Sequence, residues 1–149
     1  MSASETAAPK APSAASAGCV KLRPGQAYAG KQGFDYAEGI SRESVGSQAI
    51  CMHVLTIPPG GRAKAHLHES HETAICILSG RTVTYWGERL EHRMEAGAGD
   101  LIYIAAGVPH LPMNIGEEDA VAVIARTDPH EQESVVLRPD LEALVPSAT

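Results

Sequence analysis

Short runs of apolar and β-branched residues, each bounded by turn-forming residues, constrain the fold of this 149-residue chain more than any other feature. Runs of this kind are typical of β-strands, and clusters of glycine and proline mark the turns between them. They predict strands over residues 20–22, 47–57, 62–68, 73–78, 81–86, 101–104, 120–126 and 134–137, and a short helix over 140–144. Because no long amphipathic helix interrupts this series, we predict an all-β sandwich or barrel.

The chain is long enough for one domain, and its first residues differ in composition from the rest. Residues 1–18 are mainly alanine, serine and proline. Such a segment cannot bury enough apolar surface to offset the entropy that it would lose on ordering. We therefore expect residues 1–18 to be disordered and residues 19–149 to form a single folded domain.

The charge pattern argues against nucleic-acid and membrane partners. The chain carries 12 Lys and Arg against 18 Asp and Glu, a net charge of −6, and its basic residues form no run. Nucleic acids and anionic lipids select clustered basic side chains. No apolar stretch approaches the roughly 20 residues that span a membrane. We expect neither kind of partner.

The three cysteines, Cys19, Cys51 and Cys76, form no C-x-x-C pair. An odd number without metal-binding spacing is typical of reduced thiols in a reducing compartment. The N-terminal segment also lacks the apolar core of a secretory signal. These features predict a cytoplasmic protein in which Cys51 and Cys76 are small buried residues.

Four histidines are candidates for a metal site. His66 and His68 are separated by one residue, so in a strand both rings point to the same face. His71 follows closely, and His110 lies in a later segment that could bring another ring to the same place. Neutral imidazole is the commonest protein ligand for metals. The pattern predicts a metal site built by two segments of the chain.

The spacing around these histidines resembles the two motifs of the cupin family. In the first motif, Gly60 is followed after five residues by His66-x-His68, and Gly80 closes the motif. In the second motif, which departs from the family where Ala105 replaces a proline, the matching positions are Gly99, Ala105-Ala106-Gly107, His110 and Asn114. The resemblance covers roughly residues 47–126. It implies a double-stranded β-helix, or jelly-roll barrel, with a metal inside the barrel.

A second departure concerns the fourth ligand. Six residues before Gly80, where the family usually has an acidic ligand, this chain has Thr73. Strand alternation puts Thr73 on the inward face and Glu72 on the other, while His71 shares the parity of Thr73. Two ligand sets follow. Either His71 completes a four-histidine site, which we favour, or a bulge turns Glu72 inward as the ligand. In the first case Glu72 is available to support a ligand or to act as a general base.

The resemblance implies one divalent transition metal, which the donor set limits to Fe, Mn, Zn, Ni or Cu. It also implies an enzyme acting on a small organic substrate. We rank a dioxygenase-type oxidoreductase first and a non-redox lyase, isomerase or cyclase second. A non-enzymatic cupin that binds a metal or another ligand is the remaining alternative.

The resemblance also implies a pocket and an assembly. Inward strand residues should line the pocket, with aromatic side chains at its mouth: Ile75, Ile77, Tyr85, Trp86 and Tyr103. The nearby basic residues Arg62, Lys64 and Arg126 are expected to be solvated. Members of the family commonly dimerise by pairing strands, so we expect a homodimer joined through residues 19–28 or 134–137.

Overall fold

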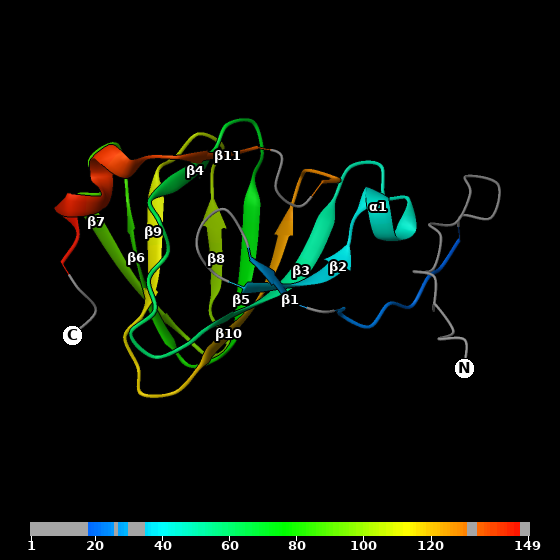
Figure 1. The fold of residues 1–149 in the computed structure, drawn as a ribbon, viewed down its shortest axis with the longest axis horizontal. Helices are drawn as coiled ribbons and strands as arrows, with labels where there is room; N and C mark the ends of the chain where they lie inside the picture. The colour runs from blue at the N-terminus through cyan, green and yellow to red at the C-terminus, as the bar shows by residue number, and fades with distance from the viewer. Residues whose placement is uncertain (1–17, 26, 30–34, 131–133, 147–149) are drawn as a thin grey trace, which may run out of the picture.

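The computed structural model describes residues 18–25, 27–29, 35–130 and 134–146. Within them, two antiparallel sheets enclose a core (Figure 1). The elements in chain order are β1 (Ala27–Ala29), β2 (Asp35–Ile40), α1 (Arg42–Val45), β3 (Cys51–Ile57), β4 (His66–His68), β5 (Thr73–Ser79), β6 (Arg81–Trp86), β7 (His92–Gly97), β8 (Leu101–Ile104), β9 (His110–Asn114), β10 (Ala120–Arg126), β11 (Val135–Leu137) and the 3-10 helix η2 (Pro139–Leu144). The predicted all-β class is confirmed.

We call the two layers sheet A and sheet B. Sheet A has the strand order β1-β2-β3-β10-β5-β8, and sheet B has the order β11-β4-β9-β6-β7. In both sheets, strands distant in sequence become neighbours: β10 pairs with β3 and β5, and β9 pairs with β4 and β6. This interleaving brings the two histidine-bearing segments together.

The inner face of sheet A follows from strict alternation in β10. Along this strand buried and half-buried residues alternate, and Ala122, Ile124 and Arg126 are among the buried set. The same alternation on β5 buries Thr73 and Ile77, as the sequence predicted. The inner face is therefore apolar along most of its length and polar near the end that carries Thr73 and Arg126.

The outer face of sheet B is covered by the chain's own C-terminal segment. Leu141 of η2 and Val145 after it pack against Ala65, Val83 and Leu111 in one buried cluster. η2, drawn in red at the left of Figure 1, therefore closes this side of the barrel. Burial of a large aliphatic side chain contributes roughly 1.5–3 kcal/mol.

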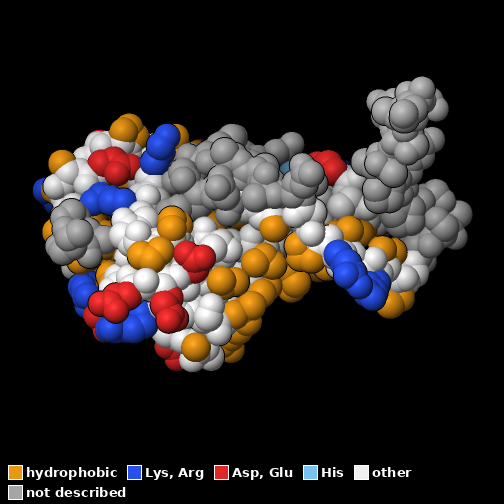
Figure 2. Space-filling view, turned by 60° about the horizontal axis from the view of Figure 1, so that its bottom comes forward, with side chains coloured by type: hydrophobic (Ala, Val, Ile, Leu, Met, Phe, Trp, Pro, Cys, Tyr) orange, Lys and Arg blue, Asp and Glu red, His pale blue; other side chains and the backbone are white. Residues whose placement is uncertain are grey.

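The outer face of sheet A has no such cover from the described residues. Large apolar side chains remain exposed there: Ile50 (54%), Met52 (40%), Leu78 (53%), Leu101 (80%) and Tyr103 (64%). All of them lie on or beside β3, β5 or β8 of sheet A. Figure 2 shows hydrophobic side chains gathered in a band across the lower part of the molecule, with charged side chains on either side. A contiguous apolar surface of this kind marks an interaction site.

Most of the predicted strands are confirmed, and three of them (81–86, 101–104 and 120–126) have the predicted bounds. The predicted strand over 20–22 is wrong: Val20 and Lys21 are exposed, Leu22 is half-buried, and none of the three belongs to a strand. The strand over 47–57 begins only at Cys51, after a bend, and the one over 62–68 narrows to His66–His68 with an isolated bridge at Arg62. The predicted disorder of 1–18 lies outside the described residues except for Gly18.

The motif glycines Gly60, Gly80, Gly99 and Gly107 all have positive φ, as the turn interpretation requires. Gly80 is the most constrained. Its φ is +86°, and a Cβ atom there would lie 2.6 Å from the Cα of Ala120. Only glycine allows the β5–β6 turn to pass so close to β10.

The cysteines are reduced, as the sequence predicted. No disulfide joins the three cysteines; Cys19 is exposed, Cys51 is buried and Cys76 is half-buried. Among the residues that the structure describes, no helix is both long and apolar enough to cross a membrane.

Candidate metal centre

Three of the four predicted histidines come together inside the barrel. His66 and His68 lie on β4 with both rings buried, and His110 opens β9 as the direct partner of His66. Their candidate ligand atoms all lie within 4.8 Å of one another. Since residues directly opposite in a ladder share a face, the pairing of β4 with β9 is what assembles the triad.

Backbone carbonyls fix the orientation of two of the rings. The Nδ1 atom of His66 lies 2.7 Å from the Lys64 carbonyl oxygen, and the Nδ1 atom of His110 lies 2.9 Å from the Val108 carbonyl oxygen. A carbonyl can only accept, so each Nδ1 carries the proton and donates it. In the neutral ring, Nε2 then keeps its lone pair. This is the usual arrangement around a metal-binding histidine.

The hydrogen bonding of the third ring, His68, indicates whether a metal ion fits between the three histidines. Both ring nitrogens of His68 are buried and have no hydrogen-bond partner among the described residues. A buried polar atom left without a partner costs about 1–3 kcal/mol. A metal ion between the three rings would satisfy one of these nitrogens, so the donor set fits a transition metal.

All three rings are held neutral, which metal binding requires. Burial lowers the pKa of His68 to about 2, with the Arg126 charge as the next cause, and lowers that of His110 to about 4. Burial likewise lowers the pKa of His66 well below its ordinary value, and His110 adds to this shift. The rings therefore present lone pairs at physiological pH without first losing a proton.

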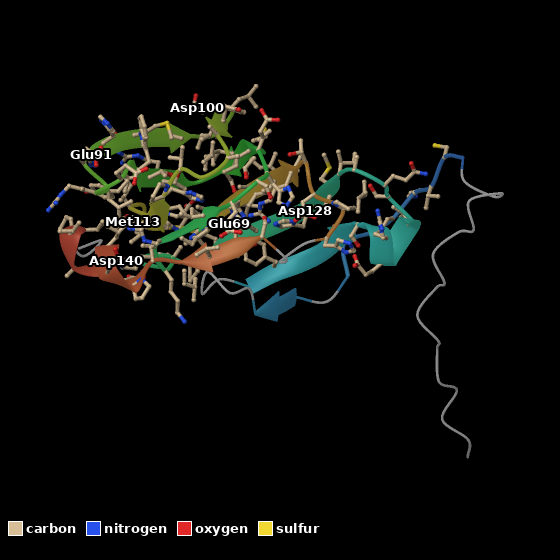
Figure 3. The ribbon with its side chains drawn as sticks, turned by 90° about the horizontal axis from the view of Figure 1, so that it is seen from above. Glu69, Glu91, Asp100, Met113, Asp128 and Asp140 are labelled. Atoms are coloured by element: carbon tan, nitrogen blue, oxygen red, sulfur yellow. The ribbon has the colours of Figure 1, made fainter. Side chains whose placement is uncertain are left out.

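The structure does not bring His71 or Glu72 into the triad. The Nε2 atom of His71 lies 3.1 Å from a carboxylate oxygen of Asp128, which is buried just beyond the end of β10 and is labelled in Figure 3. Glu72 is on the opposite parity, as the sequence predicted, and accepts a hydrogen bond of 2.7 Å from the Tyr103 hydroxyl. The fourth ligand stays a prediction.

Arg126 corrects one sequence expectation. It was predicted to be solvated, but its residue is only 5% exposed. The reason is parity: Arg126 lies at an inward position of β10, and its direct partners are Cys51 on β3 and Thr73 on β5. Strand alternation along residues 120–126 already puts Arg126 on the same face as Ala122 and Ile124. The sequence reasoning missed this because a charged residue at the end of a strand is usually solvated. Arg62, by contrast, is half-buried and donates to the carbonyl oxygens of Glu142 and Val145.

His53 is a further inward polar residue that the sequence did not single out. It is 1% exposed, and both of its ring nitrogens lack a hydrogen-bond partner in the described part of the chain. Burial lowers its pKa to about 3, and the Arg126 charge adds to this shift. Its ring meets the edge of Tyr36 at 4.8 Å between centroids.

An apolar cavity of about 260 Å³ lies beside the triad. Its walls include Thr84, Trp86, Met94, Tyr103, Ile104 and Val108. Trp86 is the direct partner of His110 in sheet B, and Ile104 is the direct partner of Thr73 in sheet A. The predicted role of Trp86 and Tyr103 as wall residues agrees with this cavity, whereas Tyr85 packs on the outer cluster of sheet B. We call this cavity the Trp86 pocket.

Known proteins that resemble this chain have the same double-stranded β-helix fold. The family model described as "Cupin domain" matches residues 53–126. A Klebsiella pneumoniae protein described as an uncharacterized conserved protein with a double-stranded β-helix domain matches with a TM-score of 0.54 and 22% identity, over 61% of this chain and 76% of that chain. No curated protein matches the sequence.

Two oxalate enzymes share the same architecture. Lactobacillus farciminis oxalate decarboxylase, solved as a formate complex, matches with a TM-score of 0.65 and 20% identity, over 81% of this chain and 36% of that chain. A recombinant oxalate oxidase in complex with glycolate matches with a TM-score of 0.61 and 19% identity, over 72% of this chain and 56% of that chain. At these identities the likeness establishes the fold alone.

The chain belongs to the cupin family. Its two motifs, the family-model match and the double-stranded β-helix agree on this point. Within that family it carries three buried histidines that can hold a metal ion.

Proposed function

We propose that this chain is a metal-dependent enzyme that acts on a small organic substrate, and that its reaction is an oxidation of the dioxygenase kind. The observation that carries the proposal is the buried triad of His66, His68 and His110 beside an apolar pocket. A metal with free coordination positions next to a small cavity is typical of a catalytic site, since a structural site would be closed by protein ligands.

The bound ion would supply Lewis acidity and, if it is Fe, Mn, Cu or Ni, one-electron chemistry that Zn lacks. The chain's own residues prepare the site for it. The backbone carbonyls of Lys64 and Val108 accept hydrogen bonds from Nδ1 of His66 and His110, so that the Nε2 atom of each ring is left free for the metal. The Trp86 pocket places the substrate against His110 and limits the access of water.

Proton transfer is the proposed task of Glu72. Its carboxylate accepts the Tyr103 hydroxyl proton in a 2.7 Å hydrogen bond, and Tyr103 also lines the Trp86 pocket. Both side chains lie on the outer face of sheet A, so this pair would take a proton from a substrate group that reaches the Tyr103 edge of the pocket. This pair favours the second candidate function, a non-redox lyase, isomerase or cyclase, if the resident metal is Zn.

A non-enzymatic role as a metal- or ligand-binding cupin is the remaining candidate. The position of this chain among known folds supports a small acid as the first substrate class to assay, because the two oxalate enzymes were solved with formate and glycolate. The chain spans only 36% and 56% of the lengths of those enzymes, so their reactions are not carried over.

We also propose that the chain forms a homodimer through the exposed outer face of sheet A. Four neighbouring strands about 4.8 Å apart, with β3, β5 and β10 seven residues long, make a face of about 20 by 20 Å. With its side chains this face is of the order of the roughly 800 Å² per partner that stable interfaces bury. A second copy supplies an equally apolar face in a two-fold arrangement.

The function is tested by loading the purified protein with Fe(II), Mn(II) or Zn(II) and screening small carboxylic acids, enols and catechols for oxygen consumption. Oxygen-consuming turnover by the wild-type protein loaded with a redox metal, together with no turnover by the His68→Ala variant, would support the oxygenase. Product formation without oxygen uptake, with Zn, would support the lyase, isomerase or cyclase. Metal binding without turnover of any substrate would favour the binding role.

A further inference from the structure

A single row of side chains crosses the inner face of sheet B and connects the Trp86 pocket with the histidine triad. His92 on β7 is the direct partner of Trp86 on β6. Trp86 is in turn the direct partner of His110 on β9, which is the direct partner of His66 on β4. Residues directly opposite in a ladder share a face, and neighbouring strands lie about 4.8 Å apart. Trp86 therefore stands one strand away from His110.

His92 covers one face of the Trp86 indole. The two rings are stacked, with 4.3 Å between their centroids and 29° between their planes. His92 is not among the described residues that line the Trp86 pocket, whereas Ala105 and Val108, which lead into His110, do line it. The face of Trp86 that is turned away from His92 therefore borders the pocket, on the side of His110.

The described walls of the Trp86 pocket carry no charged side chain. They include Met94, whose thioether makes favourable contacts with aromatic rings. The hydroxyl groups in the wall belong to Thr84 and Tyr103, and the Tyr103 hydroxyl already donates to Glu72. A charged group buried against such walls would be costly. The pocket therefore suits the uncharged organic part of a ligand.

The size of the Trp86 pocket limits that organic part to one ring. The pocket has a volume of about 260 Å³. An apolar cavity of roughly 150 Å³ is enough to bind benzene, whereas pockets for drug-sized ligands have roughly 300–1,000 Å³. A single six-membered ring with small substituents therefore fits this pocket, and a fused polycyclic ligand does not.

We infer that Trp86 is the residue that determines substrate specificity, and that the substrate is a planar, single-ring aromatic compound. The substrate ring stacks on the face of Trp86 that borders the pocket, and its oxygen substituent points along the row toward His110 and the metal. Stacked aromatic pairs gain energy beyond the area that they bury, so the pocket prefers an aromatic ring to a saturated one. His92 is a positioning residue that holds the indole in place. This inference rests on the proposed function and narrows its substrate.

The test uses the metal-free full chain, in which Trp86 is the only tryptophan. Phenol and cyclohexanol, which differ mainly in the planarity and π electrons of the ring, are titrated separately. Binding is followed by the fluorescence of Trp86 and by the NMR signals of the Met94 and Ile104 methyl groups. We expect phenol to quench Trp86 and to bind about fivefold more tightly than cyclohexanol. Equal affinity for the two probes, or binding of neither, would overturn the inference.

Variants assign the preference to the stacked pair. Trp86→Leu should reduce the preference for phenol to below about twofold, whereas Trp86→Phe, which keeps an aromatic face, should retain most of it. His92→Ala should weaken phenol binding several-fold. A folded Trp86→Leu variant that keeps the full preference would overturn the inference. If Trp86→Leu does not fold, the two probes on the wild-type protein and His92→Ala decide.

Zn(II) titration of the same samples separates this inference from the proposed function. The Trp86 and His92 variants should bind Zn(II) like wild type, because neither residue belongs to the triad. A wild-type protein that binds no Zn(II) refutes the proposed metal site. A protein that binds Zn(II) but does not distinguish phenol from cyclohexanol refutes only the aromatic subsite.

Discussion

The Nδ1 atom of His66 lies 2.7 Å from the carbonyl oxygen of Lys64, two residues earlier in the same chain. The contact fixes the tautomer of the His66 ring, with the proton on Nδ1. Because the acceptor is a backbone carbonyl, substitution of the Lys64 side chain should leave this hydrogen bond intact. His110 repeats the arrangement with Val108, also two residues earlier. The triad is therefore oriented before any metal arrives, which lowers the cost of binding.

Removal of one triad histidine should abolish tight metal binding. Loss of a residue that merely supports a metal ligand lowers metal affinity roughly 10- to 100-fold. We expect His66→Ala, His68→Ala or His110→Ala, each of which removes a ligand itself, to lower the metal affinity by at least that much. Isothermal titration with Zn(II) measures this directly. The exposed His92, which stacks on Trp86, offers the matched control: His92→Ala should titrate like wild type.

The residues predicted as a fourth ligand allow a second test. His71→Ala and Glu72→Ala should both keep stoichiometric metal, because Asp128 and Tyr103 hold these side chains outside the triad. Metal content of each purified variant gives the answer. If only one of the two variants loses its metal, that residue turns inward on binding and is the fourth ligand.

Sequence reasoning reached the fold and the triad for a definite reason. His66-x-His68 and the glycines of both motifs are local patterns, and strand alternation turned them into correct inward and outward faces for Thr73 and Glu72. The ladder that joins His66 to His110 is non-local, and only the motif resemblance anticipated it.

The sequence reasoning was least reliable where tertiary contacts decide. β2 and β7 are rich in polar and glycine residues and lack a strand pattern, yet the neighbouring strands pair with them. β9 contains Pro112, and proline within a run of residues argues against a strand because it cannot donate a ladder hydrogen bond. Within the described residues, however, β9 pairs with the short strand β4 only at His110, so the ladder on that side does not need a donor at Pro112. Whether His71 points inward depends on Asp128, which lies far along the chain and has no local signature.

The metal-free protein should lose stability in mild acid. His53, His68 and His110 have pKa values of about 3, 2 and 4 when folded, against the ordinary value of 6.5 for an exposed ring. The unfolded chain thus takes up protons below about pH 6.5 that the folded protein cannot. Each such histidine removes about 1.4 kcal/mol of stability per pH unit until its folded pKa is reached. Urea unfolding in EDTA between pH 7.5 and 4.5 measures the slope.

A matched variant checks the origin of that slope. His53→Gln removes one buried histidine outside the triad, so its stability should fall less steeply with acid by one histidine's share. An unchanged slope in this variant would mean that His53 does not contribute.

The Glu72–Tyr103 pair should be visible in a phenol titration. The hydrogen bond to Glu72 raises the pKa of Tyr103, so Glu72→Gln should lower that pKa toward 10. NMR or ultraviolet titration of Tyr103 measures the change. Tyr103→Phe identifies the Tyr103 signal by removing it. A Tyr103 pKa that does not respond to Glu72→Gln would remove the basis for proton transfer through this pair.

The exposed face of sheet A predicts the assembly. Leu101 is 80% exposed, so Leu101→Lys should leave the fold intact and convert the proposed dimer to a monomer. Light scattering during size-exclusion chromatography measures the mass. Glu88→Gln at the β6–β7 turn changes the charge by the same amount away from this face and should leave the mass unchanged. A wild-type monomer at high protein concentration would contradict the proposal.

We propose that His66, His68 and His110 together hold one transition metal ion. The most direct measurement is elemental analysis of the protein as purified, without added metal, followed by titration of the metal-free form. We expect about one equivalent of Fe, Mn, Zn, Ni or Cu per chain, or its uptake to that level, and loss of this capacity in His68→Ala. A folded wild-type protein that contains no metal and takes up none would contradict it.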